Sequence, residues 1–202
     1  MALEARGITF GYPQGGPVLY RDFSLSVEPS EHVALDAPSG AGKTTLCRLL
    51  AGYERPLSGH VAVDGEPLPK RGACPVQLIG QHPEHALDPR MRMELSLREA
   101  GEVPADAIDA LGIKGEWLRR FPHELSGGEL QRFCIARAVA VRPRYLIADE
   151  ISTMLDAVTQ AEIWRYLLEA VAREGMGLVF VSHSPDLAGR IATRSVDLSA
   201  QA

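Results

Sequence analysis

Several features that mark particular classes of protein are scarce or missing in this sequence. Its 202 residues include only three cysteines, at positions 47, 74 and 134. That odd, widely spaced set fits neither a disulfide framework nor paired zinc ligands, so we expect a reducing compartment. No apolar run approaches the roughly 18 residues that a membrane-spanning helix needs, and residues 1–6 lack an apolar signal core. We therefore expect a cytosolic protein.

An excess of basic charge is also missing. Lysine and arginine total 21 against 26 for aspartate and glutamate, which gives a formal net charge of -5 and a pI of about 5.7. Nucleic-acid-binding proteins usually carry a basic patch or stripe, so nucleic acid is not an expected partner. Any anionic ligand must be held by local groups.

The length and composition fit one soluble domain. Hydrophobic residues make up 46% of the chain and charged residues 23%, which is an ordinary mix for a globular protein with a sizeable core. A chain of 202 residues lies at the upper end of one domain, so we expect a single domain over residues 1–202.

The order of the elements indicates an α/β fold. The first third reads as strands interrupted by turns, and the second half alternates helices with the apolar strands 144–148 and 177–182. That alternation predicts a mainly parallel sheet flanked by helices. We further expect an N-terminal antiparallel β lobe that includes strands at 60–63 and 76–79, and a small helical subdomain inserted over about 92–140.

A glycine-rich segment between an expected strand and an expected helix carries the strongest local signal. Its glycines let backbone N–H groups point inward, the helix N-terminus adds partial positive charge, and Lys43 would reach the terminal phosphates. The Thr44 hydroxyl could bind magnesium. The alternative is a glycine turn with a surface lysine, and Ala37 replaces the usual first glycine of such loops. We expect a nucleoside triphosphate to bind here, at Ser39, Gly40, Ala41, Gly42, Lys43, Thr44 and Thr45.

Two adjacent acids follow the apolar run 145–148. Asp149 and Glu150 would project from the carboxyl end of a buried strand, where open α/β sheets bind ligands. By themselves, two acids at a strand end are more often simply solvated. Beside a phosphate loop, Asp149 would hold the magnesium shell, and Glu150 would orient or deprotonate the attacking water.

The segment 125–129, with the sequence LSGGE, precedes another expected helix. Ser126 and Glu129 have the spacing of a capping box. A cap alone does not explain Gly127 and Gly128, because a glycine costs up to about 1 kcal/mol of helix stability relative to alanine. A second anion site, made of a hydroxyl, exposed N–H groups and the helix dipole, would explain them.

These motifs together resemble a known family. LSGGELQR at 125–132, between a phosphate loop and an apolar strand that ends in Asp-Glu, resembles the signature of the ABC-type ATPases, the nucleotide-binding subunits of ABC transporters. Tyr12 is similar to the aromatic that stacks on adenine in this family. Gln81 is similar to the glutamine that senses magnesium and the membrane partner, and His183 to the histidine that contacts the terminal phosphate. Met154 stands where the loop after the catalytic glutamate commonly has alanine.

The resemblance covers nearly the whole chain and implies a P-loop NTPase fold of the ABC ATPase type, with ATP and Mg²⁺ as ligands. It also implies a head-to-tail dimer, in which the signature of one subunit covers the ATP on the phosphate loop of the other. The catalytic residues that it implies are Glu150, His183 and Gln81. The metal ligands are Thr44, Gln81 and Asp149, and the covering residues are Ser126, Gly127 and Gly128.

A finer resemblance concerns the kind of transporter. Residues 81–91 and 155–161 are similar to those of the ATPase subunits of dipeptide, oligopeptide and nickel importers. We therefore expect an ATP-hydrolysing subunit that energises such an importer through separate transmembrane permease subunits. The chain would lie on the cytoplasmic face of the membrane, held there by the permease. The sequence names neither the solute nor whether the second ATPase subunit is a copy or a different chain.

Two other functions stay open. One is a soluble ABC ATPase that acts on nucleic acid or ribosomes, which the acidic charge disfavours. The other is a catalytically weak, regulatory half of an ABC heterodimer, which Ala37 and Met154 suggest. His82 and His85 are spaced as metal ligands could be, but no further ligand is nearby in the sequence, so a solvated loop is favoured.

Overall fold

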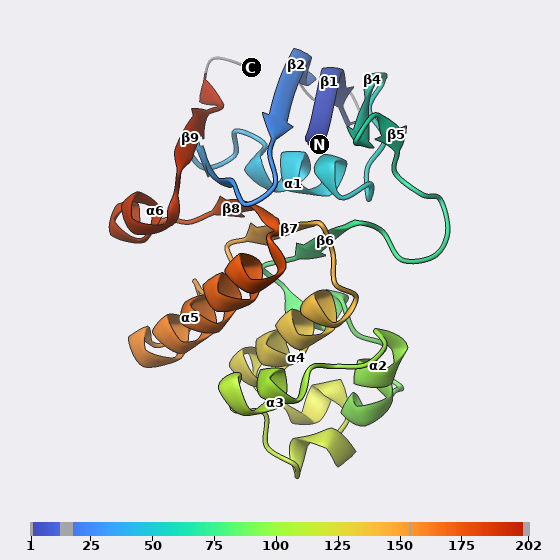
Figure 1. Cartoon of the computed structure of the whole chain (residues 1–202), viewed down its shortest axis with the longest axis vertical. Helices are drawn as coiled ribbons and strands as arrows, with labels where there is room; N and C mark the ends of the chain where they lie inside the picture. Colours follow the sequence, from blue (N-terminus) through green and yellow to red (C-terminus); the bar gives the residue numbers. More distant parts are fainter. Residues whose placement is uncertain (1, 13–17, 154, 200–202) are drawn as a thin grey trace. The chain divides into compact units, whose positions relative to one another are not determined.

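The computed structural model describes residues 2–12, 18–153 and 155–199 (Figure 1). Met154, one of the departures from the family pattern, lies outside these residues. The chain forms two compact units. Unit 1 comprises residues 1–78, 144–149 and 175–202, and unit 2 comprises residues 79–143 and 150–174.

Two β-sheets are built almost entirely from unit 1. The antiparallel sheet has the order β2-β1-β4-β5 and consists of β1 (Leu3–Gly11), β2 (Val18–Val27), β4 (Ser58–Val63) and β5 (Glu66–Pro67). The second sheet has the order β6-β7-β8-β3-β9 and consists of β3 (His32–Asp36), β6 (Val76–Ile79), β7 (Tyr145–Asp149), β8 (Gly177–Val181) and β9 (Arg194–Asp197). In this sheet β7 pairs with β8, β8 with β3, and β3 with β9, all in parallel.

The burial patterns of the strands agree with their positions in the two sheets. In β1, buried and less buried residues alternate along much of the strand, as expected when one face covers a core and the other does not. Every residue of β7 and β8 is buried, and both strands are continuous apolar runs apart from Asp149 at the end of β7. Such runs are typical of the central strands of a parallel sheet that is covered on both faces.

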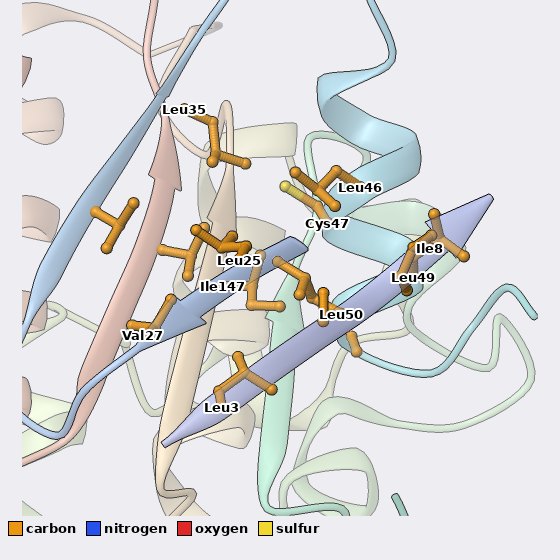
Figure 2. Close-up of a cluster of buried hydrophobic side chains, with 14 of the residues drawn as sticks. Leu3, Ile8, Leu25, Val27, Leu35, Leu46, Cys47, Leu49, Leu50 and Ile147 are labelled. Atoms are coloured by element: carbon orange, nitrogen blue, oxygen red, sulfur yellow. The ribbon is translucent and has the colours of Figure 1, made fainter. Parts of the chain in front are cut away.

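One hydrophobic core fills unit 1. Side chains from β1, β2, β3, β7 and the helix α1 (Lys43–Leu50) point toward one another in it (Figure 2). The labelled members are Leu3, Ile8, Leu25, Val27, Leu35, Leu46, Cys47, Leu49, Leu50 and Ile147. The core therefore fixes α1, and with it the segment that leads from β3 into α1. Unit 1 also contains the short helix α6 (Pro185–Ile191).

Unit 2 is helical. Its helices are α2 (Met93–Glu99), α3 (Ala105–Ala110), α4 (Gly127–Ala140) and α5 (Ala157–Glu174), with single 3₁₀ turns η1 (Pro83–His85), η2 (Trp117–Arg119) and η3 (Pro122–Glu124). The long helix α4 contacts α2, α5 and η1, and α3 contacts α5 (Figure 1). Arg137 and Arg132 of α4 form ion pairs with Glu99 of α2 and Glu162 of α5, at 3.2 and 3.3 Å. No helix of the described residues is both long enough and apolar enough to cross a membrane.

The predicted fold class is confirmed, with one strand placed wrongly. The mainly parallel sheet, the antiparallel lobe and the helical part are all present. However, residues 76–79 form β6, a neighbour of β7 in the main sheet, and do not belong to the antiparallel lobe. A strand of four residues is too short for its pattern to distinguish one sheet from another, and its pairing is decided by tertiary contacts. The extent of a single domain over 1–202, with a subdomain at about 92–140, stays a prediction.

Candidate functional site

The predicted phosphate loop lies in unit 1, between β3 and α1. β3 ends at Asp36, the chain turns through residues 37–42, and α1 begins at Lys43. Gly40 and Gly42 have φ angles of 82° and 93°, in the left-handed region that favours glycine. Gly42 is also the N-cap of α1 and supplies no side-chain acceptor for the first N–H groups of the helix. A glycine-containing turn followed by a helix start with no side-chain cap is an arrangement that suits an anion.

Lys43 lies against this loop. Its side chain is only 8% exposed, and Nζ donates hydrogen bonds to the backbone oxygens of Ala37 at 2.7 Å and Pro38 at 3.1 Å. A buried ammonium group needs acceptors, and these carbonyls supply them. Phosphate oxygens would accept stronger, charge-assisted hydrogen bonds from the same group. The loop therefore holds a positive charge where a phosphate would be neutralised.

A cavity of about 390 Å³ in unit 1 adjoins the loop. Lys43 lines it from α1, His183 lines it from the segment after β8, and Asp36 lines it from the end of β3. Asp149 ends β7 at 3% exposure, opposite Val181 of β8. These groups share the carboxyl edge of one parallel sheet, which is where α/β sheets bind ligands.

Tyr12 directly follows β1, and its hydroxyl reaches the first turn of α1. Its hydroxyl and Oγ1 of Thr45 are 3.1 Å apart, within hydrogen-bond distance. The ring stands edge-on to Phe10, with centroids 5.1 Å apart and planes at 84°, and the residue is 44% exposed. An exposed aromatic face fixed beside the phosphate loop can stack on a base.

The predicted cap of the second motif is confirmed in unit 2. Oγ of Ser126 accepts a hydrogen bond from the Glu129 N–H at 3.3 Å, and Oε2 of Glu129 accepts one from the Ser126 N–H at 2.7 Å. This capping box fixes the first turn of α4 with the residues of that turn alone. Ser126 and Gly127 are exposed.

The two glycines of this turn differ in their surroundings. A Cβ atom on Gly127 would meet nothing within 4 Å, whereas one on Gly128 would approach Cδ2 of Leu155 to 2.9 Å. Close packing against Leu155 thus explains why a glycine stands at position 128, a reason that the sequence did not reveal. Of the two glycines, Gly127 has no packing explanation, and it is the one that an anion site would explain.

A small pocket of about 70 Å³ in unit 2 brings three of the predicted residues together. Gln81, Gly127 and Glu150 all line it. Two contacts from α4 hold the segment around Gln81: Nε2 of Gln131 donates to the Gly80 carbonyl at 3.3 Å, and Sγ of Cys134 lies 3.6 Å from the Pro83 carbonyl. The signature helix therefore positions the segment that carries Gln81.

Glu150 itself has an uncommon backbone conformation. Its φ is 51°, which is left-handed and costs energy for a residue with a side chain. The turn that follows holds it, because Oγ1 of Thr153 donates to the Glu150 carbonyl at 3.2 Å. The buried indole N–H of Trp164 then donates to Oγ of Ser152 at 3.0 Å. Such strain is common where a side chain must be aimed for function.

The predicted site residues thus fall into two groups. Unit 1 holds those of the phosphate loop and sheet edge, which are Tyr12, Ser39, Gly40, Ala41, Gly42, Lys43, Thr44, Thr45, Asp149 and His183. Unit 2 holds Gln81, Ser126, Gly127, Gly128 and Glu150. His82 and His85 are exposed, with ring centroids 5.5 Å apart, and no set of three metal-binding side chains occurs among residues 2–12, 18–153 and 155–199.

Sequence reasoning missed the residues whose hydrogen bonds hold the site segments in place. Gln131 and Cys134 contact backbone carbonyls 51 residues away in the chain, and the hydroxyl of Tyr20 in β2 donates to the Gly42 carbonyl at 2.9 Å, 22 residues away. Trp164 contacts Ser152, 12 residues away. The one available signal was chemical. A tyrosine or tryptophan at a core position usually finds a partner for its polar atom.

Comparison with known proteins gives consistent similarities. The model of the ABC transporter family matches residues 20–153. The nickel import ATP-binding protein NikE of Shigella sonnei is 34% identical over 218 residues, which cover 95% of this chain and 81% of that protein. The energy-coupling factor transporter ATP-binding protein EcfA of Methanothermobacter thermautotrophicus is 35% identical over 208 residues, which cover 95% of this chain and 66% of that protein.

A solved structure shows the same fold. It is a dimeric ATP-binding cassette in a post-hydrolysis state, bound to ADP and Pi, and it superposes with a TM-score of 0.80. The match covers 98% of this chain and 94% of that chain at 22% sequence identity. At that identity the likeness concerns the fold alone, and it agrees with the α/β class predicted from the sequence.

Proposed function

Since the chain belongs to the ABC transporter family and is an ATPase subunit of it, we propose that it hydrolyses ATP to drive an importer of nickel, peptides or a related solute. The observation that carries the proposal is the arrangement of Lys43 and His183 around one cavity beside the phosphate loop. A nucleotide is a ligand that suits all the groups there. The exposed ring of Tyr12, fixed to Thr45, would stack on the adenine.

The donor set of unit 1 also fits a magnesium ion on the phosphates. Mg²⁺ prefers oxygen ligands, and Thr44 at the start of α1 and Asp149 at the end of β7 offer a hydroxyl and a carboxylate. Gln81 of unit 2 would complete the protein ligands. When bound, the ion would neutralise charge that develops on the terminal phosphate during its transfer.

We assign the chemistry of hydrolysis to Glu150. Its carboxylate would orient the attacking water and accept its proton, while Lys43 and His183 would hold the terminal phosphate. The left-handed backbone at Glu150, held by Thr153, supports this role because the strained conformation aims one side chain.

A second ATPase subunit, either a copy of this chain or a related one, would complete the site. Ser126, Gly127 and Gly128 of that subunit would cover the nucleotide on the phosphate loop of the first. The open space at Gly127 and the exposed start of α4 support this, since a ligand could approach the N–H groups there.

The link to transport rests on the relatives. A nickel import protein and an energy-coupling factor protein are both similar to this chain over 95% of its length. We infer that the chain binds transmembrane permease subunits from the cytoplasmic side of the membrane. The nickel and peptide branch is favoured because the segments 81–91 and 155–161 match its pattern.

Uptake measurements test the proposal. Cells that lack this chain would be supplied with the wild type, Lys43→Ala or Glu150→Gln, and uptake of labelled Ni²⁺ and of a labelled dipeptide would be compared. The proposal expects one solute to enter with the wild type and with neither variant. Equal uptake in all three strains, although the purified wild type hydrolyses ATP, would sink the importer assignment and leave the ATPase assignment intact.

A further inference from the structure

Tyr20 is a buried tyrosine whose hydroxyl donates a hydrogen bond to the backbone of the phosphate loop. It lies in β2, is 0% exposed, and its Oη donates to the carbonyl oxygen of Gly42 at 2.9 Å. Gly42 immediately precedes Lys43 and is the N-cap of α1. A residue of the antiparallel sheet therefore reaches the junction between loop and helix, 22 residues further along the chain.

The hydrogen bond from Tyr20 fixes the orientation of the whole peptide group between Gly42 and Lys43. The carbonyl of Gly42 and the N–H of Lys43 belong to one planar trans peptide, so the two groups point in opposite directions and turn together. Gly42, at a φ of 93°, is a glycine and could adopt many other conformations. Fixing its carbonyl toward the buried Tyr20 thereby fixes the N–H of Lys43 on the opposite side, away from the core.

The same carbonyl also begins the helix. It accepts the first helical hydrogen bond, from the Leu46 N–H at 2.9 Å. A rotated Gly42 peptide would break both hydrogen bonds and disturb the first turn of α1, where Lys43 and Thr44 lie. Tyr20 is thus linked to the start of the helix as well as to the loop.

Tyr20 is well suited to act as a fixed donor. Its ring packs against Phe23 with centroids 5.3 Å apart, within the core of unit 1. Burial raises the pKa of its hydroxyl above the ordinary value, with smaller contributions from Cys47 and Tyr12, so the group keeps its proton. A Cβ on Gly42 would lie 3.0 Å from Oη, so the fit between the two residues leaves no spare room.

We propose that Tyr20 is a positioning residue for the nucleotide, because its hydroxyl locks the Gly42–Lys43 peptide in the orientation that keeps the Lys43 N–H available to phosphate. This inference rests on the proposed function of the loop. Tyr20 touches no ligand itself and acts only through Gly42. Its loss should therefore weaken nucleotide binding and leave the chemical step nearly unchanged.

The test compares Tyr20→Phe with a matched control. Tyr20→Phe keeps the ring and removes only the hydroxyl. Tyr145→Phe removes another buried tyrosine hydroxyl of unit 1, at the opposite end of β7 from Asp149. The Kd for ATP would be measured by calorimetry, and KM and kcat by phosphate release, at a temperature at which circular dichroism shows all three proteins folded.

We expect the Kd and KM for ATP to rise about 3- to 10-fold in Tyr20→Phe, the effect of one lost hydrogen bond, with kcat within about 2-fold of wild type. Tyr145→Phe should bind ATP as the wild type does. The inference is overturned if Tyr20→Phe binds ATP as tightly as the wild type, or if Tyr145→Phe is weakened equally.

A second measurement needs no nucleotide. Amide hydrogen exchange of residues 42–46 should be faster in Tyr20→Phe than in wild type and unchanged in Tyr145→Phe. Equal exchange in all three would show that the hydroxyl does not lock the loop. If the wild type fails to bind ATP, the proposed function is wrong, while the exchange result still decides whether Tyr20 holds the Gly42 peptide.

Discussion

The phosphate loop of unit 1 and the signature segment of unit 2 both lead into a helix, yet they are stabilised by different means. The N-cap of α1 is Gly42, which has no side chain to cap the helix, and distant residues such as Tyr20 hold the loop. The N-cap of α4 is Ser126, which forms a complete capping box with Glu129 of the first turn. Remote substitutions should therefore disturb the phosphate loop, whereas the signature segment should respond mainly to changes in its own residues.

The two units also differ in their proposed roles in catalysis. In our account, the loop of unit 1 binds the nucleotide with groups that the core already holds in place, such as the nearly buried Lys43. Unit 2 contributes Glu150, the proposed base for hydrolysis, and the residues that cover the nucleotide. These residues are exposed, as at Gly127, or strained, as at Glu150. Substitutions in the phosphate loop of unit 1 should then mainly weaken ATP binding, and substitutions in unit 2 should mainly lower turnover.

The largest effect is expected for Glu150→Gln. The substitution keeps the size of the side chain and one acceptor oxygen but removes the base, so turnover should fall about 100-fold or more. The Kd for ATP should stay near that of wild type, because unit 1 supplies the binding groups. Phosphate release and calorimetry on the same samples measure both quantities. A loss of ATP affinity as large as the loss of turnover would contradict the division between the units.

For Lys43→Ala the largest expected change is in the affinity for ATP. Without the ammonium group, charge-assisted hydrogen bonds to phosphate are lost, and the Kd for ATP should rise about 10- to 100-fold. Calorimetry checks this directly. Unchanged affinity would remove Lys43 from the binding site, since the lysine would then serve only the carbonyls of Ala37 and Pro38.

Substitutions of Ser126 can distinguish its role as a helix cap from its proposed contact with the nucleotide. Aspartate caps a helix as well as serine does, so Ser126→Asp should change the unfolding free energy by less than about 0.5 kcal/mol. Its negative charge would repel phosphate, and turnover should fall about 10-fold or more. Ser126→Ala is the control, because it loses the cap and about 1 kcal/mol of stability. Full turnover in Ser126→Asp would leave the serine with a structural role only.

The smallest effects distinguish the two neighbouring glycines. Gly127→Ala meets open space and should keep or raise the unfolding free energy, by up to about 1 kcal/mol, while turnover falls about 3- to 10-fold. Gly128→Ala crowds Cδ2 of Leu155 and should lower the unfolding free energy, by less than about 1 kcal/mol, because the end of that side chain can move. Chemical denaturation and ATPase rates of the pair decide whether Gly127 serves a ligand.

The features that the sequence predicted well are local. The capping box at Ser126, the glycine loop and the helix from Lys43 depend on residues within a few positions of one another, and all three are found in the structure. β7 and β8 were predictable because a fully buried strand is a continuous apolar run.

The features that the sequence did not predict depend on contacts between distant segments. The sheet to which β6 belongs is decided by its pairing with β7, some 70 residues along the chain. β9 (Arg194–Asp197) was missed because no residue in it is fully buried and it shows no apolar alternation. The role of Tyr20 and the packing reason for Gly128 likewise need the folded chain, since their partners Gly42 and Leu155 lie 22 and 27 positions away.

Light scattering of Glu150→Gln, with and without ATP and Mg²⁺, tests most directly the claim that two ATPase subunits complete one site. Wild-type turnover would be measured at the same protein concentrations. The account predicts that ATP doubles the mass of the variant and that the specific activity of the wild type falls on dilution. It would be contradicted by a wild type that hydrolyses ATP at full rate while its mass stays that of one chain.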